Sequence, residues 1–293
     1  PARRQRAQYD KWLLCLKPRH STIKLHHMEQ LAAQDLGDLI DLERYQLDDP
    51  IHLAAVKARL DREGVVILPD FLRASARDAL VLEAEKQAEN AFFTSSTHNV
   101  YLTSQDQSLP AEHIVNRQIK SSKGCITTDQ IPEGSGLKTL YHNPQFQSFI
   151  MAVLGEKALY AYADPLSSIN VHYAHEGQEL GWHFDNSSFA ITLLLQAPEG
   201  GGVFEYVPDL RDAAAGEMNF QGVADVLEGA TPVKTLDMQP GTLVLFRGRN
   251  SLHRVTPTAG NRTRLLVVLA YNDAPGVSLS EGARMTFYGR VGT

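Results

Sequence analysis

A short segment at residues 181–186, Gly-Trp-His-Phe-Asp-Asn, carries the side chains best suited to metal chemistry. On an extended backbone, residues i and i+2 project to the same side, so His183 and Asp185 can reach one point while Phe184 faces away. His253, about 70 residues further on, is the best candidate for a third ligand. Two neutral imidazoles and one carboxylate suit a divalent iron and leave positions open for exchangeable ligands. We therefore predict a metal site here, with no catalytic side chain beyond the metal centre.

A chance arrangement is the alternative interpretation of these three residues. The chain contains 11 histidines, so a His-x-Asp spacing can arise without function. Asp185 would then be a turn residue, and His253 would be a surface or hydrogen-bonded histidine. The residues around the three candidates must therefore decide between the two interpretations.

The first half of the chain is predicted to be helical with interruptions. Asp49 and Pro50 are typical of an N-cap and a first helical position, and Gly64 ends the predicted helix. A buried strand at 65–68 follows. Ser75 and Asp78 resemble a capping pair that begins a helix over about 75–90. A third helix is predicted from Asn143-Pro144 to Gly155, which would end it.

After about residue 158, short apolar runs alternate with turn residues. Such punctuation favours a β-sandwich or barrel. The stretch 208–231 lacks β periodicity, and we interpret it as an insertion that could be helical and fold over a barrel mouth. We predict a single domain over 1–293, in which 1–157 is mostly helical, 158–275 is the β core and 276–293 is a C-terminal extension. The predicted strands are 168–173, 189–196, 203–206, 233–237, 242–246 and 264–271.

Composition restricts the class of protein. The net charge of -6 argues against nucleic acid as the main partner, because phosphate binding needs a basic surface. No apolar stretch is long enough to span a bilayer, so no membrane partner is expected. Cys15 and Cys125 have no metal-ligand spacing and are expected to be reduced thiols of a cytoplasmic protein. The basic residues near the start are interpreted as a solvated helix end rather than a transit peptide: Arg3, Arg4, Arg6, Lys11, Lys17 and Arg19.

The stretch from Ile169 to Asn272 resembles the iron(II)- and 2-oxoglutarate-dependent oxygenases. The matches occur in the order and spacing of that superfamily. They are the strand and turn at 170–177, the His-x-Asp motif at 182–185, the Glu-Gly-Gly-Gly-Val-Phe turn at 199–204, the strand at 239–246, and His-Arg-Val-Thr-Pro at 253–257 followed by Gly-Asn-Arg at 260–262.

The resemblance implies a mainly β (α+β) fold: a double-stranded β-helix, which is a jelly-roll, cupin-like core, with flanking N-terminal helices. It also implies Fe(II), O2 and 2-oxoglutarate, which chelates the metal through its 2-oxo group and C1 carboxylate. An arginine suits the C5 carboxylate because its planar fork can hold both oxygens. We favour Arg262, by its spacing from His253, over Arg264, which shares its strand parity. Whichever does not bind is expected to be a surface arginine.

Weaker candidates surround the predicted site. Asn170 or Tyr173 could reach the co-substrate, although Tyr173 could equally be a core residue with its hydroxyl satisfied. Thr192 could face the co-substrate or bond to backbone. Trp182 is interpreted as a packing residue that could also wall the substrate pocket. The polar stretch 116–124 is a solvated loop, or else Arg117 or a neighbour binds an acidic part of the substrate.

A second resemblance, carried by 116–124 and 183–187, is to the branch that acts on free amino acids and includes amino-acid halogenases. Halogenases of that branch replace the metal-binding carboxylate by a small residue, which opens a position for halide. Asp185 is present here, so hydroxylation, desaturation or ring closure of a small amino-acid-like molecule is expected, with release of succinate and CO2. The alternatives are a cupin-like metalloenzyme that does not use 2-oxoglutarate and a non-catalytic binding module.

Overall fold

The computed structural model describes residues 35–292. The basic residues near the start and Cys15 therefore lie outside the described residues. Cys125 is a buried free thiol. Among residues 35–292, no helix combines the length and apolar character needed to cross a membrane.

One antiparallel sheet of 11 strands curls around the site, in the order β1-β10-β6-β13-β4-β3-β5-β11-β8-β9, with β2 paired to β3. Strands distant in sequence are neighbours in this order, as the predicted double-stranded β-helix requires, and the predicted fold class is confirmed. A short pair, β7 (Gly200–Gly201) and β12 (Thr258–Ala259), lies apart from it. The strands are β1 (Val65–Leu68), β2 (Phe92–His98), β3 (Ile119–Ile126), β4 (Ile169–Ala174), β5 (Leu180–His183), β6 (Ala190–Gln196), β8 (Phe204–Val207), β9 (Lys234–Leu236), β10 (Leu243–Phe246), β11 (Leu252–Val255) and β13 (Arg264–Leu269).

The predicted helix ends are confirmed where a capping side chain is present. In α2 (Pro50–Glu63), the Asp49 carboxylate accepts from two backbone N–H groups of the first turn, and Gly64 closes the helix in the left-handed conformation. Asn143 and Gly155 do the same for α5 (Pro144–Leu154). The predicted capping pair at Ser75 and Asp78 is wrong, because α3 (Ala74–Gln87) begins after Arg73 without a side-chain cap. A 3-10 turn at Ala88–Asn90 continues that helix.

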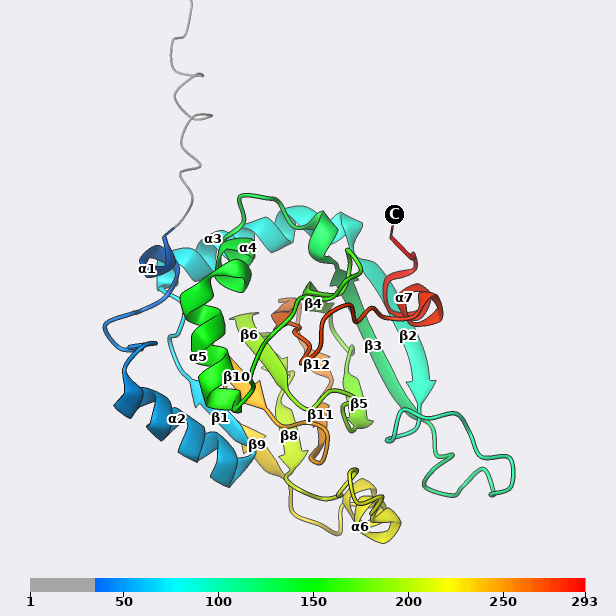
Figure 1. Ribbon diagram of the computed structural model, residues 1–293. Helices are drawn as coiled ribbons and strands as arrows, with labels where there is room; N and C mark the ends of the chain where they lie inside the picture. Colours follow the sequence, from blue (N-terminus) through cyan, green and yellow to red (C-terminus); the bar gives the residue numbers. More distant parts are fainter. Residues whose placement is uncertain (1–34, 293) are drawn as a thin grey trace, which may run out of the picture. The chain divides into compact units, whose positions relative to one another are not determined.

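The helices α2, α3, α4 (Gly136–His142) and α5 lie on the same side of the sheet, next to the short α1 (Leu36–Leu39) (Figure 1). Their apolar side chains, such as Phe146 and Phe149, form the main core with alternate residues of β4, β6, β10 and β13. Because successive strand residues point to opposite faces, the intervening residues face the other way. Some of those residues, among them His172, Thr192 and Val244, line a cavity inside the curled sheet.

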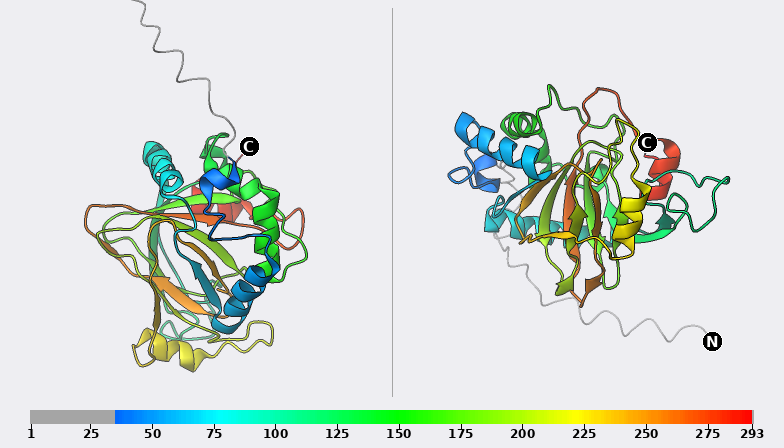
Figure 2. Two further views of the ribbon diagram at one scale, coloured as in Figure 1. Left: turned by 90° about the vertical axis from the view of Figure 1, so that its left-hand side faces the viewer. Right: turned by 90° about the horizontal axis from the view of Figure 1, so that it is seen from below.

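Several parts of the fold were not predicted as they stand, β5 and β11 among them. The stretch 116–124, interpreted as a loop, contains the start of β3, which pairs with β2 along its whole length. Helices α4 and α7 (Glu281–Tyr288) were also missed. The insertion at 208–231 is partly helical, as expected. Its helix α6 (Phe220–Leu227) lies at one end of the sheet (Figure 2) and packs against a second apolar cluster that contains Trp182 and Phe184.

Candidate metal centre

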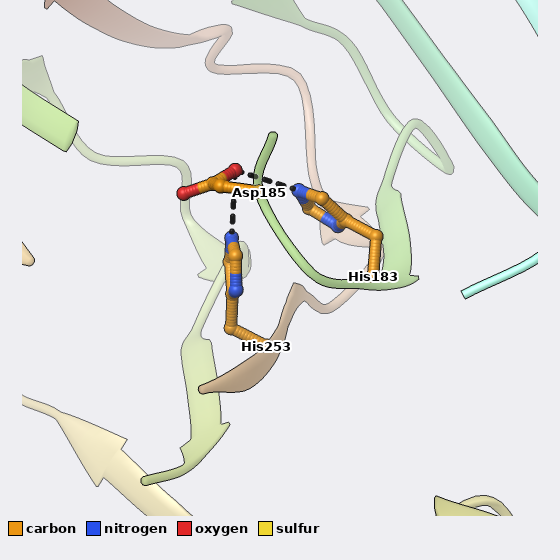
Figure 3. A group of neighbouring side chains, drawn as sticks. All are labelled: His183, Asp185 and His253. Atoms are coloured by element: carbon orange, nitrogen blue, oxygen red, sulfur yellow. Dashed lines mark ion pairs between the residues drawn. The ribbon is translucent and has the colours of Figure 1, made fainter. Parts of the chain in front are cut away.

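Two neighbouring antiparallel strands bring the three predicted ligands together. His183 ends β5, Asp185 follows two residues later, and His253 on β11 lies directly across from His183 in the strand register. The Nε2 atoms of His183 and His253 lie 3.6 and 3.5 Å from Oδ1 of Asp185. Their ligand atoms all lie within 4.8 Å of one another (Figure 3). This spacing is short enough for one ion to contact all three side chains.

Backbone carbonyl groups hold both imidazoles in the orientation that ligation needs. Nδ1 of His183 donates to the carbonyl of Gly181 at 2.8 Å, and Nδ1 of His253 donates to the carbonyl of Ser251 at 2.9 Å. A proton on each Nδ1 leaves the Nε2 lone pair free and directed at Asp185. This is the second interaction that metal-binding histidines usually make.

The charge states also fit a cation. Burial, followed by the nearby His253, lowers the pKa of His183 and keeps this imidazole neutral, as metal binding requires. Burial alone would raise the pKa of Asp185, but His253 and His183 outweigh burial and lower that pKa. Oδ2 of the Asp185 carboxylate is buried and has no hydrogen-bond partner. The three residues therefore fit a divalent metal ion, with Oδ1 of Asp185 as the carboxylate oxygen nearest both imidazoles.

The backbone of Gly248 lies against the Asp185 carboxylate. The Gly248 carbonyl accepts the N–H of Asp185 at 3.1 Å. A Cβ atom added at residue 248 would lie 1.8 Å from Oδ2 of Asp185, far inside van der Waals contact. Asp185 can therefore hold its position only because residue 248 has no side chain.

A cavity of about 360 Å³ adjoins the triad, within the size range of small-molecule sites. One wall, formed by β2 and β3, is polar and presents Thr94, Ser96, His98, Ser121 and Lys123. The lining from β6, β10 and β13 is largely apolar, with Ile191, Val244, Phe246, Leu266 and Val268 among its residues. The cavity thus joins a metal-binding corner to a space for organic ligands.

Of the two candidate arginines, the structure brings Arg264 to the cavity and leaves Arg262 outside it. Arg264 is 5% exposed, lines the cavity, and its Nη2 is buried without a hydrogen-bond partner. Burial lowers its pKa to about 10, so the guanidinium stays charged near neutral pH. Arg262 precedes β13, is exposed, and donates to the carbonyl of Pro198 at 3.1 Å. The preference for Arg262 is corrected, because its guanidinium has a partner away from the cavity.

Thr192 lines the cavity, whereas Asn170 and Tyr173 do not. Asn170 is buried among backbone carbonyl groups and accepts a hydrogen bond from the Tyr288 hydroxyl at 3.0 Å. The Tyr173 hydroxyl donates to the carbonyl of Ala84 at 2.6 Å. The expectation that Asn170 or Tyr173 reaches the co-substrate is therefore corrected, and Tyr173 is the satisfied core residue of the alternative interpretation.

Neither predicted substrate-binding residue lines the cavity. Trp182 is 7% exposed, and the Arg254 guanidinium lies 4.8 Å from its ring centroid, so this indole packs rather than walls a pocket. Arg117 lies before β3 and is partly buried outside the cavity. Sequence reasoning missed Lys123 and His172, which do line it. Alternation along a strand could have found Lys123, had β3 been predicted.

The fold and the triad define a class: double-stranded β-helix proteins with a two-histidine, one-carboxylate metal centre. The family model for HalD, Halogenase D, matches residues 49–280, and the chain belongs to this family. No curated protein matches the sequence.

Solved structures with a similar fold share little sequence with this chain. They include the non-heme alpha ketoglutarate dependent epimerase SnoN from nogalamycin biosynthesis, at 16% identity and a TM-score of 0.54 over 77% of this chain and 82% of that chain. SnoN in complex with Fe3+, alpha ketoglutarate and nogalamycin RO matches at 16% identity and a TM-score of 0.53, covering 77% and 85%. The carbocyclase SnoK from the same biosynthesis matches at 14% identity and a TM-score of 0.53, covering 78% and 89%. These similarities support the fold.

Proposed function

We propose that this protein is an Fe(II)- and 2-oxoglutarate-dependent oxygenase that oxidises an aliphatic C–H bond of a small, amino-acid-like substrate. The observation that carries the proposal is the complete triad of His183, Asp185 and His253 beside a cavity that also contains Arg264. Both alpha ketoglutarate dependent structural neighbours and the motif order of the sequence support it.

Each residue has a role that its position supports. His183, Asp185 and His253 would hold the ferrous ion from one side. Arg264 would bind the C5 carboxylate of 2-oxoglutarate, because its unpartnered guanidinium faces the cavity from β13. Thr192, which lines the same cavity and pairs with Val268 in the strand register, is a second proposed hydrogen-bonding partner. The bound iron and 2-oxoglutarate, with O2, supply the oxidising power and release succinate and CO2.

The presence of Asp185 decides which reaction we propose. A halide needs a coordination position that a carboxylate ligand would otherwise fill. Here the carboxylate is present, lies within 4.8 Å of both imidazole ligand atoms, and fits closely against Gly248. We therefore propose hydroxylation, or desaturation or ring closure, in place of halogenation, although the chain belongs to the Halogenase D family.

Anaerobic titration of 2-oxoglutarate into the Fe(II)-loaded protein tests the co-substrate. We expect binding by the wild type, and binding about 10–100-fold weaker for Arg264→Met, because a charge-assisted bidentate contact is lost. Arg262→Met is the matched control and should bind like the wild type. A wild type that binds Fe(II) but not 2-oxoglutarate would favour the cupin-like alternative and end this proposal.

Exposure of the loaded protein to O2 with a panel of amino acids then tests the reaction. Succinate is quantified, and product mass distinguishes hydroxylation from desaturation or cyclisation. Asp185→Ala should weaken Fe(II) binding strongly and lower succinate formation with it. Succinate that forms equally without Asp185 would contradict the assigned ligand set.

A further inference from the structure

The polar wall of the cavity contains a lysine, Lys123, with no acidic partner among residues 35–292. Lys123 lies on β3, between Ser121 and Cys125 on the same strand face. Its Nζ lies 3.0 Å from Nε2 and 3.3 Å from Nδ1 of His172, which lines the cavity from β4. No carboxylate of the described residues forms an ion pair with it. A positive charge that is shielded from water destabilises the protein unless a negatively charged group pairs with it.

His172 does not supply the missing negative charge. Burial, followed by Lys123 and Arg264, lowers the pKa of His172 well below its usual value, so the ring is neutral, and the nitrogen that faces the ammonium accepts from it. Burial also lowers the pKa of Lys123, while Cys125 and Asp185 oppose this effect. An ammonium group has three N–H donors, and His172 accepts from it, so donors remain that a ligand in the cavity can use.

Charge balance shows what kind of ligand this would be. Asp185 is the only acidic residue among the described residues that line the cavity, and it belongs to the metal site. A ferrous ion, Asp185, Arg264 and the 2-oxoglutarate dianion together carry no net charge. Lys123 then remains as a single positive charge without a counter-ion, which matches one carboxylate.

We infer that Lys123 binds a carboxylate group of the substrate, with His172 holding the ammonium in place, while the apolar wall receives the rest of the molecule. This inference rests on the proposed function and deepens it, because it names the group by which the substrate is recognised. The apolar lining of the same cavity includes Leu266, Val268 and Phe246, which suits an aliphatic chain next to the metal site.

Isothermal titration of the Fe(II)- and 2-oxoglutarate-loaded protein without O2 tests the inference. The probes are 4-methylpentanoate and its amide, 4-methylpentanamide. They share the same alkyl chain and differ only in carrying a carboxylate or a neutral carboxamide. We expect the acid to bind the wild type at least about tenfold more tightly than the amide, as expected for one charge-assisted hydrogen bond. In Lys123→Met this preference should disappear while the affinity for 2-oxoglutarate stays within about twofold.

Lys120→Met is the matched control, because Lys120 lies on the same strand but is exposed; it should keep the preference for the acid. Lys123→Met could instead weaken 2-oxoglutarate binding as much as Arg264→Met does. That result would place Lys123 in the co-substrate site and overturn this inference, while the proposed function would stand. Equal binding of acid and amide by the wild type would also overturn it, even if Lys123→Met failed to fold. A wild type that does not bind 2-oxoglutarate would instead end the proposed function, and this inference with it.

Discussion

The geometry of the ligand triad depends on backbone groups that are not part of the His-x-Asp and distal histidine motifs. His183 and Asp185 share a face because they are two residues apart, but each imidazole is oriented by a carbonyl two residues before it, at Gly181 or Ser251. Asp185 is positioned by a residue from another segment, Gly248. The geometry of the site is thus determined as much by backbone as by side chains.

Gly248→Ala is expected to weaken Fe(II) binding by about 10–100-fold, the range seen when a group that orients a metal ligand is changed. The added Cβ would meet Oδ2 of Asp185 and push this carboxylate away from the two histidines. Fe(II) affinity is measured by anaerobic titration. Gly282→Ala is the control, because a Cβ there meets nothing within 4 Å.

A double-substitution cycle separates this steric effect from general damage. In an Asp185→Gly background the clash partner is absent, so adding Gly248→Ala should change residual Fe(II) affinity very little. An equal loss in both backgrounds would show that residue 248 acts by some route other than Asp185.

At the scale of elements, β3 connects the two parts of the site. It pairs with β2, β4 and β5, so one strand reaches from the wall that carries His172 to the strand that ends at His183. Its cavity-facing side chains include Ser121 and Lys123. The apolar pattern of the sequence does not predict β3, because this strand lines a cavity rather than an apolar core and its residues are mostly polar.

Tyr173→Phe tests how the helices are attached to the sheet. The Tyr173 hydroxyl of β4 donates to the carbonyl of Ala84 in the last turn of α3, where helix carbonyls lack intrahelical partners. Its loss should lower the free energy of unfolding by about 1–2 kcal/mol, measured by urea denaturation, with unchanged Fe(II) and 2-oxoglutarate affinity. Tyr160→Phe, at a 37% exposed side chain, should have almost no effect. Weakened 2-oxoglutarate binding in Tyr173→Phe would return Tyr173 to the co-substrate site.

At the scale of the whole molecule, the cavity gathers charges that the polypeptide does not balance locally. Lys123 and Arg264 have no acidic partner among the described residues, and Oδ2 of Asp185 has no donor. Such groups reduce stability in the ligand-free protein. Binding of a cation and a dianion should therefore stabilise the fold as well as prepare the reaction.

We expect Fe(II) and 2-oxoglutarate, each at about 100 times its Kd and without O2, to raise the melting temperature. A single ligand at that excess contributes about 2.7 kcal/mol, which corresponds to about 5 °C for a chain of this size. Differential scanning calorimetry provides the measurement, and Asp185→Ala should show little of the shift. A shift of the same size in Asp185→Ala would mean that the ligands bind elsewhere.

Much of the fold could be predicted from local pattern. The helix over 50–63 follows from Asp49, Pro50 and Gly64, and the strand pattern after residue 158 follows from alternating apolar runs and turns. The pairing of β2 with β3 could not be predicted in this way, because these strands face a polar cavity. The choice between Arg262 and Arg264 likewise depends on where β13 begins, a boundary that local pattern does not define.

By itself, the sequence determined the type of chemistry: two imidazoles and a carboxylate at a spacing that suits a metal, and the motif order of an oxygenase. Only the tertiary structure decided which side chains share the cavity with that metal. Strand register placed Arg264 and Lys123 inside and turned Arg262, Asn170, Tyr173 and Trp182 elsewhere. The physical reason is that ligand identity is a local property of the chain, whereas enclosure depends on strands that pair across long sequence distances.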